Sequence, residues 1–287
     1  MAQSSQPEVK LDALSPAEMA TKAEASGIAK LAKPTAQLLV LAVLAGAYIS
    51  LGGIFYTTVV AGTNALPYGV QRLLGGAAFC LGLILVVVGG AELFTGNSLV
   101  AMAWASRKAT TRELLRNWGL VYVGNFAGSL ATAGLMFLTG QYAFGGGAVG
   151  LTALSAGNSK CTLAFVPAVA LGIMCNILVC LAVWLCYSAR STADKILAIL
   201  FPISAFVAAG FEHSVANMYF IPVALFIKAG ATDGFWAAIG KNASDFADLT
   251  WGSFLLRNLL PVTLGNVIGG ALLVGGAYWF VYLRKQH

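Results

Sequence analysis

The sequence predicts an all-α polytopic membrane protein, in which six transmembrane helices form an inverted 3+3 repeat and spans 2 and 5 are broken. The 287-residue chain is 59% hydrophobic and 10% charged, with a mean hydropathy of +0.81, which lies outside the range of soluble domains. Six apolar segments are long enough to cross about 30 Å of hydrocarbon. We expect the spans near Ala36–Ala61, Leu73–Ala105, Asn117–Thr139, Leu163–Tyr187, Ile196–Ala229 and Leu259–Leu283.

Residues 1–34 precede the first span and are predicted to form a cytoplasmic segment with one short amphipathic helix. Ser15-Pro16-Ala17-Glu18 combines an N-cap serine, proline at the first helical position and glutamate in the capping-box place. The segment lacks the apolar core of an export signal. Its helix has mostly alanines at apolar positions, which favours a surface helix lying on the protein or the bilayer; the alternative is a mobile gate under the pore. Residues 35–287 form the predicted pore domain.

The second and fifth spans are too long for simple crossings, and each contains an interruption. Gly89 to Asn97 breaks the second, and Gly210 to Asn217 breaks the fifth. Irregular backbone at membrane depth must face protein or a water-filled cavity, because unsatisfied amide groups are too costly in lipid. Thr95 and Asn97 are candidate caps for the half-helix after the first break, as Ser214 and Asn217 are after the second.

An internal repeat relates the two halves of the chain. Gly90, Glu92 and Asn97 recur as Gly210, Glu212 and Asn217 at a shift of 120 residues, and Arg116-Asn117, Gly124-Asn125 and Gly128 recur as Arg257-Asn258, Gly265-Asn266 and Gly269 at a shift of 141. Each copy holds three spans, an odd number, so the second copy is inverted. We expect the repeats at about 36–140 and 160–284, with the site near the midplane between them.

The repeated motifs predict specific structural roles. The small residues one turn apart in spans 3 and 6 are typical of helix–helix contacts. Asn125 and Asn266 lie within those motifs, where each can hydrogen-bond exposed backbone of a broken helix. Glu92 and Glu212 precede the half-helices, and we expect them to hold the breaks by accepting backbone amide hydrogens rather than to transfer protons.

His213 is the only histidine outside the carboxyl terminus, and it lies in the second break. An ionisable side chain at that depth is a candidate for permeation. It could donate a hydrogen bond as neutral imidazole, or carry charge and a proton at modest acidity. No second histidine or cysteine pair accompanies it, so neither a metal nor another cofactor is predicted.

The loops predict the orientation. Twelve lysines and arginines fall on the side of the two termini and five on the other, so both termini are expected in the cytoplasm of an inner-membrane protein. The net charge of +6 reflects this topology and gives no indication of nucleic-acid binding. The five cysteines are odd in number and contain no Cys-x-x-Cys pair, which favours apolar packing over disulfides.

These motifs resemble the formate/nitrite transporter family, and its formate channels most of all. The resemblance rests on Gly210-Phe211-Glu212-His213-Ser214-Val215-Ala216-Asn217-Met218, Gly90-Ala91-Glu92-Leu93-Phe94-Thr95 and the segment from Pro261 to Gly270. It implies a homopentamer in the cytoplasmic membrane, with an aquaporin-like fold and one pore in each protomer. Glu92 stands where some relatives have aspartate.

The same resemblance implies roles for individual residues. His213 would face the middle of the pore beside Thr95, with Asn176 nearby, and Lys160 would draw anions into the outer vestibule. Phe79, Leu83 and Leu93 would narrow the pore toward one side, and Val179 and Phe206 toward the other; Phe94 is also assigned to the constriction.

The function that follows is a passive or proton-linked channel for formate, a small anion of a weak acid. A bare ion pays a large desolvation penalty in an apolar constriction, which a hydrogen bond or a proton from His213 would reduce. Nitrite and hydrosulfide remain alternative substrates, and a neutral-solute channel is a further alternative. An intramembrane enzyme such as a rhomboid protease is rejected, because no Gly-x-Ser-x-Gly elbow or separate nucleophile–base pair occurs.

Overall fold

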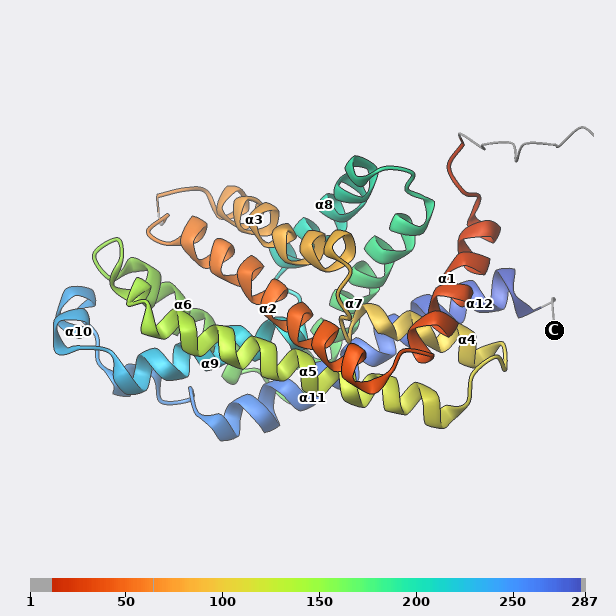
Figure 1. Cartoon of the computed structure of the whole chain (residues 1–287). Helices are drawn as coiled ribbons and strands as arrows, with labels where there is room; N and C mark the ends of the chain where they lie inside the picture. The colour runs from red at the N-terminus through yellow and green to blue at the C-terminus, as the bar shows by residue number, and fades with distance from the viewer. Residues whose placement is uncertain (1–11, 64, 285–287) are drawn as a thin grey trace, which may run out of the picture.

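The computed structural model describes residues 12–63 and 65–284, and these residues form helices and loops without a strand. Figure 1 shows the arrangement. The elements in chain order are α1 Pro16–Leu31, α2 Thr35–Val60, α3 Tyr68–Gly89, η1 Gly96–Val100, α4 Ala101–Ala105, α5 Thr111–Leu138, η2 Gln141–Ala143, α6 Ala148–Cys161, α7 Phe165–Ser188, α8 Thr192–Ala209, α9 Ser214–Gly230, α10 Asp233–Ile239, η3 Ala243–Phe246, η4 Ser253–Leu259, α11 Leu260–Val267, η5 Ile268–Gly276 and α12 Ala277–Tyr282.

Six helices of the described chain are long and apolar enough to cross a membrane, as the sequence predicted. They are α2, α3, α5, α7, α8 and the continuous helix 253–282, in which η4 and η5 are π-helical. The second and fifth spans are broken at the predicted places. After α3 the chain passes through residues 90–95 into the short helices η1 and α4, and after α8 it passes through residues 210–213 into α9.

The amino-terminal helix α1 is packed into the protein. It begins with the predicted capping box, in which Ser15 and Glu18 exchange side-chain and backbone hydrogen bonds and Pro16 takes the first helical position. Its buried residues are Met19, Ala20, Ala23, Glu24, Gly27 and Leu31. Helix α6 buries Val149, Gly150, Ala153, Leu154, Gly157 and Cys161. Each α6 position lies 130 residues after its counterpart in α1, so the two helices are structural equivalents.

The inverted repeat is therefore wider than the sequence analysis expected. The predicted boundaries, about 36–140 and 160–284, leave out α1 and most of α6. At this shift the two helices share only Ala23/Ala153, Gly27/Gly157 and Lys30/Lys160, and their low apolarity hides them from a search for spans. In the structure one repeat begins with α1 and the other with α6, each ahead of three spans.

The two ends of the molecule carry different elements. In Figure 1, α1 and α12 lie toward one end and α6 and α10 toward the opposite end. The amino- and carboxyl-terminal helices thus share an end, in agreement with an even number of crossings. Lys10 and Lys285, which contributed to the loop charge count, lie outside the described residues.

Candidate functional site

The first break is held open by an asparagine on the neighbouring span. Gly90 is the C-cap of α3, and its φ of +84° lies in the left-handed region that suits glycine. The Asn125 side chain of α5 accepts a hydrogen bond from the Phe94 amide at 2.8 Å and donates to the carbonyl oxygens of Ala42 and Glu92 at 2.7 and 2.9 Å. One buried side chain therefore satisfies a backbone donor and a backbone acceptor within the break and ties the break to α2.

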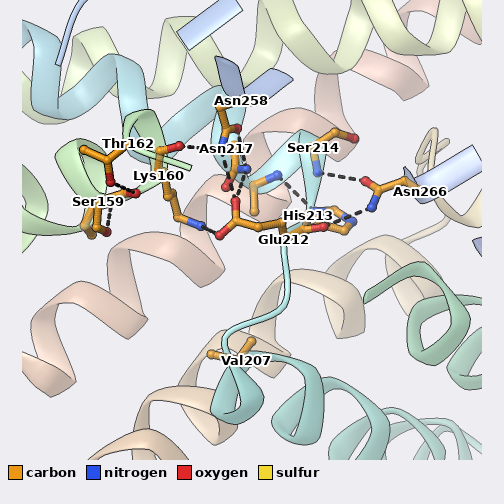
Figure 2. A network of polar contacts seen from close by, with 12 residues as sticks. Ser159, Lys160, Thr162, Val207, Glu212, His213, Ser214, Asn217, Asn258 and Asn266 are labelled. Atoms are coloured by element: carbon orange, nitrogen blue, oxygen red, sulfur yellow. Dashed lines mark hydrogen bonds and ion pairs between the residues drawn. The ribbon is translucent and has the colours of Figure 1, made fainter. Parts of the chain in front are cut away.

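The second break repeats this arrangement. Gly210 is the C-cap of α8, with a φ of +78°. Asn266 accepts from the Ser214 amide at 2.9 Å and donates to the carbonyl oxygens of Gly172 and Glu212 at 2.8 and 2.9 Å, as Figure 2 shows on the Ser214 side. Both asparagines make the backbone contacts that the sequence predicted.

The two glutamates form ion pairs instead of the predicted bonds to backbone amides. The Glu212 carboxylate lies 2.8 Å from Lys160 Nζ and accepts from Asn217 at 2.6 Å and from Asn258 at 3.2 Å (Figure 2). Asn258 also donates to the Lys160 carbonyl oxygen at 3.0 Å. The Lys160 and Glu212 side chains are 18% and 7% exposed, so each buried charge is compensated by its partner.

The same network recurs at the first break. Glu92 pairs with Lys30 of α1 at 2.7 Å and with Lys33 at 3.3 Å. Asn97 donates to Glu92 at 2.8 Å and to Asn117 at 3.0 Å. Sequence reasoning missed Lys30, although a signal exists: Gly27-Ile28-Ala29-Lys30 and Gly157-Asn158-Ser159-Lys160 share glycine and lysine at a shift of 130.

His213 is itself the N-cap of α9. Its Nδ1 atom accepts a hydrogen bond from the Ala216 amide at 3.0 Å, and its Nε2 atom lies 2.8 Å from Thr95 Oγ1. The predicted caps are wrong: Ser214 and Asn217 do not cap α9, and neither Thr95 nor Asn97 makes a side-chain capping bond to η1. A backbone N–H only donates, so Nδ1 carries a lone pair and the proton of the neutral ring is on Nε2.

Two cavities approach this pair from opposite sides. The α6-side vestibule is a cavity of about 230 Å³ lined by Lys160, Glu212 and His213 among others. The α1-side vestibule, of about 400 Å³, is lined by Lys30, by Glu92 and its neighbours in the first break, and by residues of α3, α7 and α8. Between them lies a pocket of about 10 Å³, here called the waist, which His213 also lines. A volume of that size is close to the minimum for one water molecule.

Five of the six predicted constriction residues line the waist: Phe79, Leu83, Leu93, Val179 and Phe206. Their grouping differs from the expectation. Phe79 and Phe206 pack edge to face with ring centroids 5.7 Å apart, and both line the α6-side vestibule, whereas the two leucines line the α1-side vestibule. Phe79 therefore belongs with Phe206 and not with the leucines.

Phe94 and Asn176 have other surroundings than expected. The Phe94 ring packs against Tyr122 and Trp118 of α5, at centroid distances of 4.9 and 6.3 Å, and lines none of the three cavities. Its assignment to the constriction is wrong. Asn176 is buried and lines none of these cavities either; it donates to the carbonyl oxygens of Asn266 and Thr95, which fixes the backbone beside His213.

Positive charge predominates in both vestibules. The charged residues that line the α1-side vestibule are Lys22, Lys30, Lys33, Lys195 and Glu92. Those that line the α6-side vestibule are Arg72, Lys160 and Glu212. Cation-lined concave surfaces concentrate anions. Within residues 12–63 and 65–284, no cluster of His, Cys, Asp and Glu side chains has the arrangement of a metal site.

Comparisons with known proteins agree on one family. A family model described as formate/nitrite transporter matches residues 17–280. The chain is 46% identical over 275 residues to the formate channel FocA of Escherichia coli (strain K12), with 96% of each chain covered, and 41% identical to FocA of Haemophilus influenzae with the same coverage. A solved structure of a pentameric formate channel with formate bound is similar at a TM-score of 0.83 and 48% identity, covering 87% of this chain and 98% of that one.

Proposed function

The chain belongs to the formate/nitrite transporter family, and we propose that it conducts formate across the cytoplasmic membrane through a pore in each protomer of a homopentamer. One observation carries the proposal. His213 lines an apolar waist between two vestibules in which cations predominate, and the buried Thr95 hydroxyl lies 2.8 Å behind its Nε2 atom. The relatives described as formate channels, one of them pentameric, support the choice of anion and the assembly.

Permeation then depends on replacing the hydration of the anion at the waist. Phe79, Leu83, Leu93, Val179 and Phe206 offer no hydrogen bond, so an anion that loses its water there loses a large solvation energy. Lysines and Arg72 raise the anion concentration in the vestibules. His213, which lines the waist, is the donor that meets the anion there, once its Nε2–H exchanges the Thr95 hydroxyl oxygen for the anion.

The capping bond determines which proton His213 can give. The neutral ring keeps its proton on Nε2, where it donates to Thr95 Oγ1, and it can donate to an anion by exchanging that one partner. An imidazolium would place a proton on Nδ1, facing the Ala216 amide hydrogen, and would lose the N-cap of α9. We therefore propose that in this conformation His213 acts as a hydrogen-bond donor, and that full proton transfer requires the ring to leave its cap.

Flux into proteoliposomes tests this function. Wild type is expected to take up formate, and His213→Phe, which keeps the ring but has neither nitrogen, should lose most of that uptake at every external pH. His213→Asn retains both an acceptor for the cap and a donor, so it should keep more activity than His213→Phe. Equal uptake by wild type and His213→Phe would refute the role of the imidazole. Stronger competition by nitrite or hydrosulfide than by unlabelled formate would reassign the substrate.

We propose that both termini face the cytoplasm, since α1 and α12 share one end of the molecule and most loop lysines and arginines belong to that side. Protease accessibility of tags in right-side-out membrane vesicles tests this orientation.

We propose no enzymatic activity. Ser214, beside His213, has a buried hydroxyl with no hydrogen-bond partner among residues 12–63 and 65–284, so none of these residues is placed as the base that would activate it as a nucleophile.

A further inference from the structure

Arg72 of α3 lies where two cavities on the α6 side of the molecule meet. A wider cavity of about 500 Å³, here called the α6-side mouth, adjoins the α6-side vestibule. Arg72 lines both, together with Tyr56, Ala156 and Ser159. Among the described residues, Arg72 is the only charged side chain that lines the mouth. An anion that enters from this side thus meets Arg72 before Lys160.

Part of the guanidinium is used to complete the end of α8. Arg72 Nε donates to the Ala208 carbonyl oxygen at 2.9 Å, and Nη2 donates to the Val207 carbonyl oxygen. These carbonyls belong to the last turn of a half-helix that ends near the midplane, where the helix dipole places negative charge. Arg72 offsets that charge on the route of an anion.

The first repeat has no equivalent of this contact. The counterparts of Val207 and Ala208, at a shift of 120, are Val87 and Val88 at the end of α3. Within the described residues no side chain donates a hydrogen bond to either carbonyl. The position of Arg72 itself corresponds to Thr192. The polar networks of the two breaks match one another closely, so Arg72 is a feature of one side of the pore only.

The remaining donors of Arg72 are available to a ligand. A guanidinium has five N–H donors in a fixed plane. Nε and Nη2 donate to carbonyl oxygens of α8, while Nη1 has no hydrogen-bond acceptor among the described residues. A planar group with free N–H donors is suited to a carboxylate.

We propose that Arg72 is the outermost anion-binding residue of the α6 side, where its free guanidinium edge receives a small carboxylate and passes it to Lys160 and His213. This inference rests on the proposed formate conduction. It also predicts an asymmetry: removing Arg72 impairs binding of formate that arrives from the α6 side and leaves the α1 side unchanged.

Side-resolved uptake measures this asymmetry. Proteoliposomes of the full chain with an amino-terminal affinity tag are separated on a tag-binding resin, since captured vesicles expose the α1 side and the flow-through exposes the α6 side. Initial uptake of labelled formate is measured against concentration for wild type, Arg72→Gln and Arg72→Lys. Lys241→Gln is the control, because Lys241 is an exposed cation beyond α10 that lines neither cavity.

Arg72→Gln should raise the half-saturating formate concentration about tenfold from the α6 side, the effect of losing one charge-assisted hydrogen bond. From the α1 side it should stay within about twofold of wild type. Arg72→Lys restores the charge without the planar contact to α8, so it should recover much of the affinity at lower thermal stability. Raising the salt concentration should weaken wild-type uptake from the α6 side more than that of Arg72→Gln.

Three outcomes would overturn the proposal, and they can be told apart. If wild type conducts formate and Arg72→Gln has the same half-saturating formate concentration as wild type on both sides, only the role of Arg72 is overturned. Equal losses from both sides, not recovered in Arg72→Lys, would show that Arg72 acts only through the fold of α8 and would likewise overturn it. A folded wild type without formate uptake would overturn the proposed function and the role of Arg72 with it.

Discussion

Replacing Asn266 with leucine tests whether a single side chain holds the second break. Asn266 is fully buried, and its amide joins three backbone groups: the Ser214 amide, the Gly172 carbonyl and the Glu212 carbonyl. Leucine has a similar volume and no hydrogen-bonding group. The substitution therefore removes the polar contacts without leaving a large cavity.

The magnitude follows from those three bonds. Side-chain hydrogen bonds within membranes average about 0.6 kcal/mol in double-mutant cycles, and those in soluble proteins about 1 kcal/mol. Three bonds then contribute about 2–3 kcal/mol. The scaling for large soluble domains, about 2–4 °C per kcal/mol, converts this to a decrease in melting temperature of about 4–12 °C.

Thermal unfolding in detergent, followed by the size-exclusion peak of the folded protein, measures the effect. The matched control is Thr263→Val, one turn earlier on α11, which removes the single 3.0 Å hydrogen bond between Thr263 and Tyr122 and should cost less than about 3 °C. Asn125→Leu should resemble Asn266→Leu because its contacts are equivalent. If Asn266→Leu had the same melting temperature as Thr263→Val, the asparagine would not hold the break, and the reasoning from its three hydrogen bonds would fail.

Three other predictions concern packing, charge and thiol chemistry. Gly128→Ala should destabilise the protein strongly, because its Cβ would collide with the backbone of α2, whereas Gly119→Ala on the same helix has open space and should be neutral or slightly stabilising in the same melting assay. In a double-mutant cycle, Lys30→Met with Glu92→Gln should cost less than the sum of the two single changes, by about 1–3 kcal/mol, since Glu92→Gln leaves Lys30 without a carboxylate and Lys30→Met leaves Glu92 only its longer pair with Lys33; additive losses would contradict the buried pair. Burial raises the pKa of the Cys161 thiol to about 11, so at pH 7.5 it is protonated, and maleimide should label it far more slowly in folded than in denatured protein.

The breaks and their asparagines were predictable because glycine and polar residues are conspicuous in apolar sequence. A glycine at a left-handed position, such as Gly90 or Gly210, and a carboxylate at membrane depth both indicate an interruption by themselves. The fixed shift between copies then relates Asn125 to Asn266. Local chemistry and spacing were sufficient at these positions.

Side-chain direction was not predictable in the same way. Serine, threonine and asparagine are the usual N-caps, so the motif favoured Ser214, while the structure uses His213 Nδ1. Phe94 follows a leucine that lines the waist, yet its ring packs on Tyr122. Which of two neighbouring side chains faces the pore depends on the backbone path through the loop, and the sequence does not specify that path.

The equivalence of α1 and α6 explains why both vestibules are electropositive. Hydropathy finds elements that face lipid, but α1 faces protein and needs few large apolar residues. Lys30 of α1 is acceptable in a partly buried position because Glu92 offsets its charge, as Glu212 does for Lys160. A lysine–glutamate–asparagine network therefore stands at each break, so an anion approaching the waist from either side meets similar electrostatics. Such symmetry suits a pore that works in both directions, and Arg72, present on one side only, is the residue that would distinguish them.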